Sequence, residues 1–122
     1  MKHFVERSDE PMKIVAGDFN AISESPQVIT LTQEWSDSYR LANPSEQGFT
    51  CCIEDLTDGS EGALEKRIDY IFLVAEESIP TPLHAAQQVF AQPYETAYGP
   101  LWVSDHTGLF VKIQPGGEID GP

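Results

Sequence analysis

One segment of this chain is almost continuously apolar, and it limits the folds that the chain can adopt. Residues 67–75 read Arg-Ile-Asp-Tyr-Ile-Phe-Leu-Val-Ala, and after the first position only Asp69 interrupts the apolar run. Such a run, rich in β-branched and aromatic residues, is typical of a buried strand. A carboxylate among buried apolar residues is costly unless it has a partner. The segment therefore predicts a buried strand whose acid is paired.

Shorter apolar segments predict the other elements. Residues 12–16 predict a short buried strand, and Gly17 then frees the backbone for a sharp turn. Ser25 and Pro26 suit a helix start, as N-cap and first helical residue. Three apolar residues at helical spacing should then face a sheet: Val28, Leu31 and Trp35. Further strands are expected over 49–53, 85–91 and 107–113, and loops over 43–48, 54–63 and 93–103.

Acids, an amide and a histidine lie at the ends of the predicted strands or inside them. Gly-Asp-Phe-Asn follows the first strand and contains Asp18 and Asn20, while Ser-Asp-His, residues 104–106, precedes the last strand. Alone, the first string is weak evidence, because Gly, Asp and Asn favour turns for local reasons. Together with Asp69, these motifs indicate metal-assisted phosphate chemistry, in which a divalent cation stabilises charge on phosphoryl oxygens.

Gly-Asp-Phe-Asn, the Arg-Ile-Asp-Tyr of residues 67–70 and Ser-Asp-His, in this order, resemble the motifs of the endonuclease/exonuclease/phosphatase superfamily. This superfamily includes apurinic endonucleases, DNase I-like nucleases, sphingomyelinases and inositol-polyphosphate phosphatases. The resemblance implies an α/β fold that is part of a four-layer, DNase I-like sandwich, with a mixed, mostly antiparallel sheet and a flanking helix. It spans about residues 5–113 but covers only the C-terminal half of the family's domain. We therefore expect residues 1–115 to be that C-terminal portion and residues 116–122 to be a flexible tail.

The resemblance also implies a role for each motif residue. Asp18 would activate the attacking water and contribute to metal binding, and Asn20 would stabilise a phosphoryl oxygen. Asp69 would orient His106, because a carboxylate on one imidazole nitrogen sets the tautomer and favours the imidazolium. Asp105 would help to hold the metal or protonate the leaving group. Mg²⁺ (or Mn²⁺) is the expected cofactor, since hard cations prefer carboxylate oxygens.

The family's first half has no counterpart ahead of Lys13, where only twelve residues lie. In the family, that half supplies an Asn on an early strand, a metal-binding Glu and further phosphate-binding residues, so the Glu is unassigned here. We expect a metal-dependent phosphoesterase that hydrolyses phosphodiesters or phosphomonoesters. Two alternatives stay open: an inactive fragment or pseudoenzyme whose reading frame begins inside a longer gene, and an acidic protein-interaction module.

The acidity of the chain bears on its substrate and partners. Seven Lys and Arg against 20 Asp and Glu give a net charge of −13. Non-specific nucleic-acid binding depends on cations that neutralise phosphates, and no basic run is present. A small phosphate ester therefore fits better than a nucleic acid, although a lipid head group, self-association and binding of the missing half stay open. An acidic surface can also serve solubility alone.

Three further expectations concern location, cysteines and aromatic residues. No apolar stretch could span a membrane and no signal peptide is visible, so we expect a cytoplasmic protein, or a secreted one if an upstream signal has been lost. The adjacent Cys51 and Cys52 predict no disulfide framework and no zinc site, with one cysteine buried and the other not. Arg67 should be a solvated or salt-bridged charge. Tyr94, Tyr98 and Trp102 should pack over a sheet edge, with stacking on a base or lipid head group as the alternative.

Overall fold

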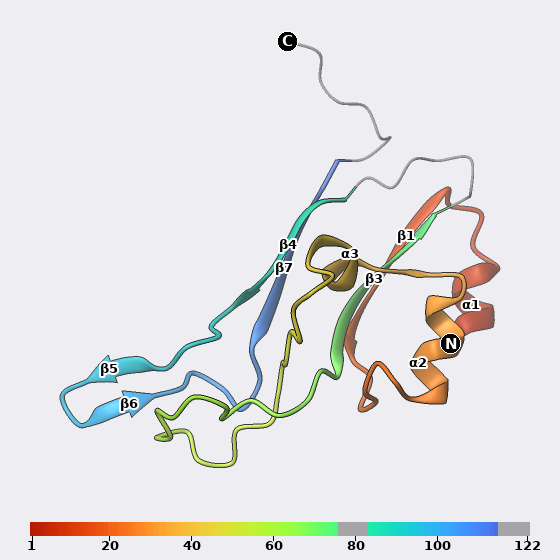
Figure 1. Cartoon of the computed structure of the whole chain (residues 1–122). Helices are drawn as coiled ribbons and strands as arrows, with labels where there is room; N and C mark the ends of the chain where they lie inside the picture. The colour runs from red at the N-terminus through yellow and green to blue at the C-terminus, as the bar shows by residue number, and fades with distance from the viewer. Residues whose placement is uncertain (76–82, 115–122) are drawn as a thin grey trace, which may run out of the picture.

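The computed structural model describes residues 1–75 and 83–114 (Figure 1). The helices are α1 (Lys2–Glu6), α2 (Pro26–Thr32) and α3 (Ser38–Ala42). The strands are β1 (Met12–Asp18), β2 (Ser36–Asp37), β3 (Asp69–Ala75), β4 (Leu83–Val89), β5 (Tyr94–Thr96), β6 (Gly99–Leu101) and β7 (Gly108–Ile113). The predicted tail at residues 116–122 lies outside the described residues.

All the strand pairs of the described residues are antiparallel. β3 lies between β1 and β2, and the register of β1 with β3 places Asp18 opposite Asp69. β4 pairs with β7, while β5 and β6 form a hairpin that extends away from the rest of the molecule (Figure 1). The predicted combination of helices with mostly antiparallel sheet is confirmed.

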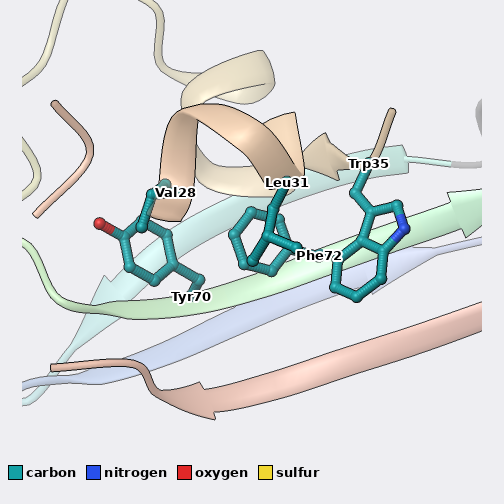
Figure 2. Packing of buried hydrophobic residues seen from close by; sticks show 5 residues of the cluster. All are labelled: Val28, Leu31, Trp35, Tyr70 and Phe72. Carbon is teal, nitrogen blue, oxygen red and sulfur yellow. The ribbon is translucent and has the colours of Figure 1, made fainter. Parts of the chain in front are cut away.

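The core forms between α2 and one face of β3. Ser25 caps α2 by accepting a hydrogen bond from the backbone N–H of Val28 at 3.3 Å, and Pro26 begins the helix, as predicted. The helix and the residues after it then pack on the strand (Figure 2). The buried members of this cluster are Val28, Leu31, Trp35, Tyr70 and Phe72. The helical spacing of the apolar residues thus identified the face of α2 that meets the sheet.

The other face of β3 is also covered, which explains its nearly continuous apolar sequence. α3 lies between β3 and β4 (Figure 1), and the Ser38 hydroxyl donates to the Ile71 carbonyl at 2.6 Å. Phe72 and Leu73, which point to opposite faces, are both buried. The prediction of a buried strand over 67–75 is confirmed, although the regular strand begins at Asp69.

Two predictions about β1 are wrong in part. The strand forms but is not buried, and Ile14 is 54% exposed. The reason is that β1 is an edge strand of the described sheet, and its Val15 packs against the core cluster from one face only. Gly17 makes no turn: it pairs with Tyr70 inside the sheet. The left-handed residue is Asn20, with φ of 51°, and asparagine tolerates this region better than most residues.

The structure differs from the sequence prediction in three other segments. Residues 49–53 form no strand but a single bridge between Cys51 and Lys66, because their backbone groups bond to residues 65–66 and 105–107. The predicted loop over 93–103 contains the β5–β6 hairpin, whose turn is closed by Thr96 Oγ1 donating to the Gly99 carbonyl at 2.7 Å. The short elements β2 and α3 were not predicted.

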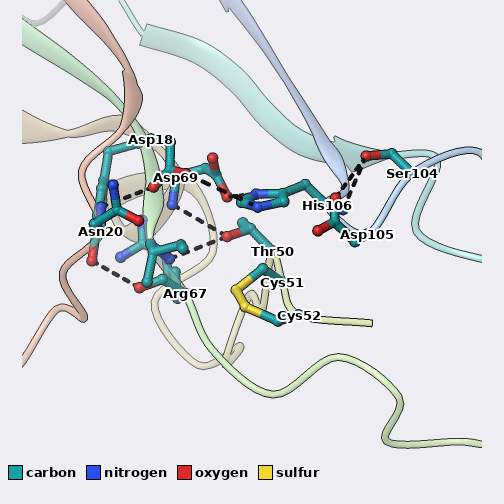
Figure 3. The surroundings of a disulfide bond; sticks show 12 residues. Asp18, Asn20, Thr50, Cys51, Cys52, Arg67, Asp69, Ser104, Asp105 and His106 are labelled. Carbon is teal, nitrogen blue, oxygen red and sulfur yellow. Dashed lines mark hydrogen bonds and ion pairs between the residues drawn. A yellow bond between two sulfur atoms is a disulfide. The ribbon is translucent and has the colours of Figure 1, made fainter. Parts of the chain in front are cut away.

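The two cysteines are joined to each other, which the sequence analysis did not expect. A disulfide links Cys51 to Cys52 (Figure 3). The two residues lie outside a regular strand, so the alternation of side chains that would separate them does not apply. Cys51 is buried and Cys52 half-buried, as predicted. Because the bond joins neighbours, it cross-links no distant segments.

Within residues 1–75 and 83–114, no helix is both long enough and apolar enough to cross a bilayer.

Candidate active site

The ends of β1 and β3 and the loop before β7 bring together an acid, a second acid and a histidine. His106 reaches across to β3, where its Nδ1 lies 2.7 Å from Oδ2 of Asp69 (Figure 3). The predicted Asp69–His106 pair is therefore present. The other ring nitrogen of His106, Nε2, faces Asp18 and lies 4.0 Å from its Oδ2. Potential ligand atoms of Asp18, Asp69 and His106 all lie within 4.8 Å of one another. The antiparallel register of β1 and β3 produces this convergence.

The charges around His106 favour its protonated form. The hydrogen bond to Asp69 raises the pKa of His106 above its usual value of 6.5, although partial burial opposes the change. The negative charges of Asp69, Asp105 and Asp18 raise this pKa further. An imidazolium bonded to Asp69 through Nδ1 leaves its Nε2–H available toward Asp18. The side chains of Asp18, Asp69 and His106 are 40%, 19% and 28% exposed, so the group is open to a ligand.

Asn20 lies in the tight turn that follows Asp18. Its backbone N–H donates to Oδ1 of Asp18 at 2.8 Å, which holds that carboxylate against the turn. Phe19 donates its own N–H to the Ile68 carbonyl at 2.9 Å, and this bond fixes the turn to the start of β3. The amide of Asn20 is exposed beside the Asp18 carboxylate. The structure thus places Asn20 next to Asp18, which is one of the three converging residues. The catalytic roles of both residues stay predictions.

The Ser-Asp-His motif is divided between anchoring and exposed positions. Ser104 Oγ accepts a hydrogen bond from the backbone N–H of His106 at 3.1 Å, which anchors the loop. The Asp105 carbonyl accepts from the N–H of Ile53 at 3.2 Å. The Asp105 side chain is exposed and is not among the three residues that converge. Its expected part in metal binding stays a prediction.

Thr50 is a positioning residue that the sequence analysis missed. It is fully buried, and its Oγ1 accepts hydrogen bonds from the N–H groups of Ile68 at 3.1 Å and Asp69 at 3.2 Å. Its carbonyl accepts from the N–H of Thr107 at 2.8 Å. One residue therefore ties the backbone of Asp69 to the loop that carries His106 (Figure 3). A threonine in a segment predicted as strand carried no signal of this role.

The fold of this chain matches part of a solved protein. An endonuclease/exonuclease/phosphatase family protein from Leptotrichia buccalis C-1013-b superposes with a TM-score of 0.60 and 26% sequence identity. The match covers 93% of this chain and 40% of that protein. This chain has the fold of part of an endonuclease/exonuclease/phosphatase domain. No protein-family model and no curated protein matches it significantly. The resemblance inferred from the motifs is thus confirmed; that the matched part is the C-terminal half stays a prediction.

The donor atoms of the group suit the hard cation expected of an endonuclease/exonuclease/phosphatase site. Asp18 and Asp69 offer carboxylate oxygens, which a hard cation prefers to the imidazole nitrogen of His106, and Oδ2 of Asp69 is already bonded to that histidine. Mg²⁺ is often held by one or two carboxylates, with water and substrate phosphates as the remaining ligands. The residues present therefore fit Mg²⁺ mainly through Asp18, and they form a sparse ligand set.

Arg67 serves the fold. Both of its terminal nitrogens bind the Asp37 carboxylate, at 2.6 and 2.5 Å, and its guanidinium lies over the rings of Tyr39 and Tyr70. Arg67 is 3% exposed, so the prediction of a solvated charge is wrong. The alternative prediction of a salt bridge is confirmed.

Of the three aromatic residues before the Ser-Asp-His motif, only Trp102 is buried, and its hydrogen bonds are to the loop at residues 54–63. Trp102 donates its indole N–H to the Asp58 carbonyl at 2.6 Å. Tyr94 and Tyr98 are exposed, so the packing prediction is wrong for both. The reason is that they belong to the hairpin that extends away from the body of the molecule (Figure 1).

Proposed function

We infer that this chain contributes the water-activating and phosphoryl-binding residues of a metal-dependent phosphoesterase. The observation that supports the proposal is the line of three groups in which Asp69 holds His106 at 2.7 Å and His106 faces Asp18 at 4.0 Å. The second distance exceeds a direct hydrogen bond, and one oxygen atom placed between the two groups could bond to both. A reacting water or phosphoryl oxygen has the size and polarity for that position.

Each residue has a distinct part in the proposed reaction. Asp18 orients the attacking water and accepts its proton. The His106 imidazolium, held by Asp69, donates through Nε2 to a phosphoryl oxygen and offsets charge that develops there. Asn20 supplies an uncharged donor beside Asp18. When bound, Mg²⁺ would neutralise phosphoryl charge and support the leaving oxygen, with Asp18 as its main protein ligand and Asp105 as a further one.

The charge of the chain favours a small phosphate ester as the substrate. At −13 the protein repels extended polyanions over roughly a Debye length, about 8 Å at physiological salt. A compact diester or monoester presents fewer negative charges to that field. We propose that the reaction takes place in the cytoplasm.

Hydrolysis of bis(p-nitrophenyl) phosphate with and without Mg²⁺ tests this proposal, with His106→Ala as the decisive variant. We expect metal-dependent turnover that falls by roughly 10²–10⁴-fold in the variant, the range for a positioned acid–base group. His3→Ala is the matched control, because His3 is exposed on α1, an element that contributes nothing to the site. Circular dichroism of each sample establishes that the protein is folded.

The outcome separates the alternatives. Turnover that needs metal and disappears only in His106→Ala supports the proposal. A folded protein without turnover contradicts it for this chain and supports an inactive fragment or pseudoenzyme. Turnover that survives in His106→Ala contradicts the role of the Asp69–His106 pair.

A further inference from the structure

A hollow of about 460 Å³ lies directly beside the proposed reaction site. Its lining begins at Asn20 and continues past Ser25, Gln27 and Cys52 to Lys66. Among the described residues that line it, Lys66 is the only charged one, and none carries a carboxylate. In a chain with 20 acids and seven Lys and Arg, a lining with a lysine and no acid among the described residues departs from the overall charge. The space next to Asn20 therefore favours a negatively charged group.

The Lys66 ammonium group is available to a ligand. Among the described residues it forms no ion pair, whereas Lys2 is bound by Glu6 and Glu34. The backbone of Lys66 is held firmly: its carbonyl accepts from the N–H groups of Thr50 at 2.7 Å and Cys51 at 2.9 Å. The side chain of Lys66 therefore extends from a well-fixed backbone, three residues before Asp69. Lys66 itself is exposed to solvent.

A neighbouring hollow explains why an anion would bind on the Asn20 side. Lys66 also borders a second hollow, whose lining includes the acids Glu24, Glu46 and Glu65. The two arginines of that lining are engaged, Arg67 with Asp37 and Arg40 with the backbone carbonyls of residues 43, 46 and 47. Carboxylates repel a second anion from that side. The Asn20 side offers the same ammonium without them.

We propose that this hollow is a second anion subsite, in which Lys66 binds a phosphate of the substrate other than the one that reacts beside Asn20. The subsite rests on the proposed phosphoesterase function and narrows its substrate to small esters that carry two phosphate groups. Lys66 is then a specificity residue, because it touches the part of the substrate that is not transformed. A single exposed ammonium binds one extra phosphate and is too little to hold a nucleic-acid strand against the charge of the chain.

Two nucleotide esters that differ by one phosphate test the subsite. The first is the 5′-(p-nitrophenyl phosphate) of thymidine, and the second is the same ester with an added 3′-phosphate. We expect wild type to prefer the second ester in kcat/KM, and Lys66→Gln to reduce this preference by roughly twofold to fivefold, mainly through KM. Lys66→Arg should retain it. Lys112→Gln is the control, since Lys112 is exposed on β7 and lines neither hollow.

A binding measurement keeps this test separate from the test of catalysis. Titration of thymidine 3′,5′-bisphosphate and of thymidine 5′-phosphate, followed by NMR, needs no turnover. Tighter binding of the bisphosphate that is lost in Lys66→Gln and kept in Lys112→Gln supports the subsite even if the chain hydrolyses nothing. An equal preference for the bisphosphate over the monophosphate in wild type and Lys66→Gln overturns the proposed subsite. Tighter binding of a short single-stranded oligonucleotide than of the bisphosphate overturns the restriction to small esters.

Discussion

Arg67 and Asp69 stand two positions apart on the same segment, and both form charged pairs, but the two pairs differ in nearly every physical respect. Arg67 is 3% exposed, is bound by two oxygens of Asp37 and is covered by aromatic rings. The Asp69–His106 pair shares one hydrogen bond, and its side chains are 19% and 28% exposed. Burial closes the first pair to a ligand, while the second leaves Nε2 of His106 facing Asp18 across 4.0 Å.

The comparison shows what separates a structural ion pair from a reactive one. Removing either member of a buried pair leaves a charge without solvent or partner, so the fold depends on the pair. A half-exposed, unsaturated pair adds little to stability, but it can donate to a ligand. Residues that are close in sequence can therefore have different roles. Solvent exposure together with an unused hydrogen-bonding group distinguishes the pair that can bind a ligand.

The largest effect should come from breaking the buried pair. Arg67→Met leaves Asp37 buried and unpaired, and we expect the free energy of unfolding in urea to fall by about 3–5 kcal/mol. The double variant Asp37→Leu/Arg67→Met should recover much of this loss, because no uncompensated charge stays behind. Asp69→Asn should cost about 1 kcal/mol or less, since its pair is partly exposed. A larger loss in Asp69→Asn than in Arg67→Met would reverse the comparison.

An intermediate effect is expected at Thr50, whose hydroxyl group holds the backbone of Asp69 in place. Thr50→Val keeps the side-chain shape but leaves the buried N–H groups of Ile68 and Asp69 without their acceptor, at a cost of about 1–3 kcal/mol. We also expect the pKa of His106, followed by NMR, to move toward its usual value as Asp69 becomes less well placed. Thr50→Ser retains the hydroxyl and is the matched control. An unchanged His106 titration in Thr50→Val would exclude the proposed coupling.

The smallest effect is the pH dependence of stability that His106 contributes. Its pKa is raised in the folded protein, mainly by Asp69, so the folded state binds its proton more tightly than the unfolded state does. The contribution is fully present below the unfolded pKa of about 6.5 and is lost as the pH rises through the folded pKa. Urea unfolding of wild type and His106→Gln between pH 5 and 9 should show an advantage for wild type only at the acidic end. An advantage that grows with pH would contradict the raised pKa.

Local patterns in the sequence predicted the parts of the molecule that depend on neighbouring residues. The apolar run around Asp69 identified a strand buried on both faces, and Ser25 with Pro26 identified the start of α2. In contrast, β1 was expected to be buried, yet Ile14 is exposed, because burial depends on what covers a strand and not on its own composition. The β5–β6 hairpin was missed, because the aromatic-rich segment 93–103 was predicted to be a loop.

By itself the sequence determined which chemical groups are available: Asp18, Asn20, Asp69, Asp105 and His106, in an order that resembles one superfamily. Only the tertiary structure decided which of them meet. The register of β1 with β3 places Asp18 opposite Asp69, and the hydrogen bonds of Thr50 bring the His106 loop to the same point. Burial of Arg67 and exposure of Lys66 were decided in the same way. The physical reason is that local propensity acts over a few residues, whereas hydrogen bonds between distant segments and solvent exposure exist only once the chain has folded.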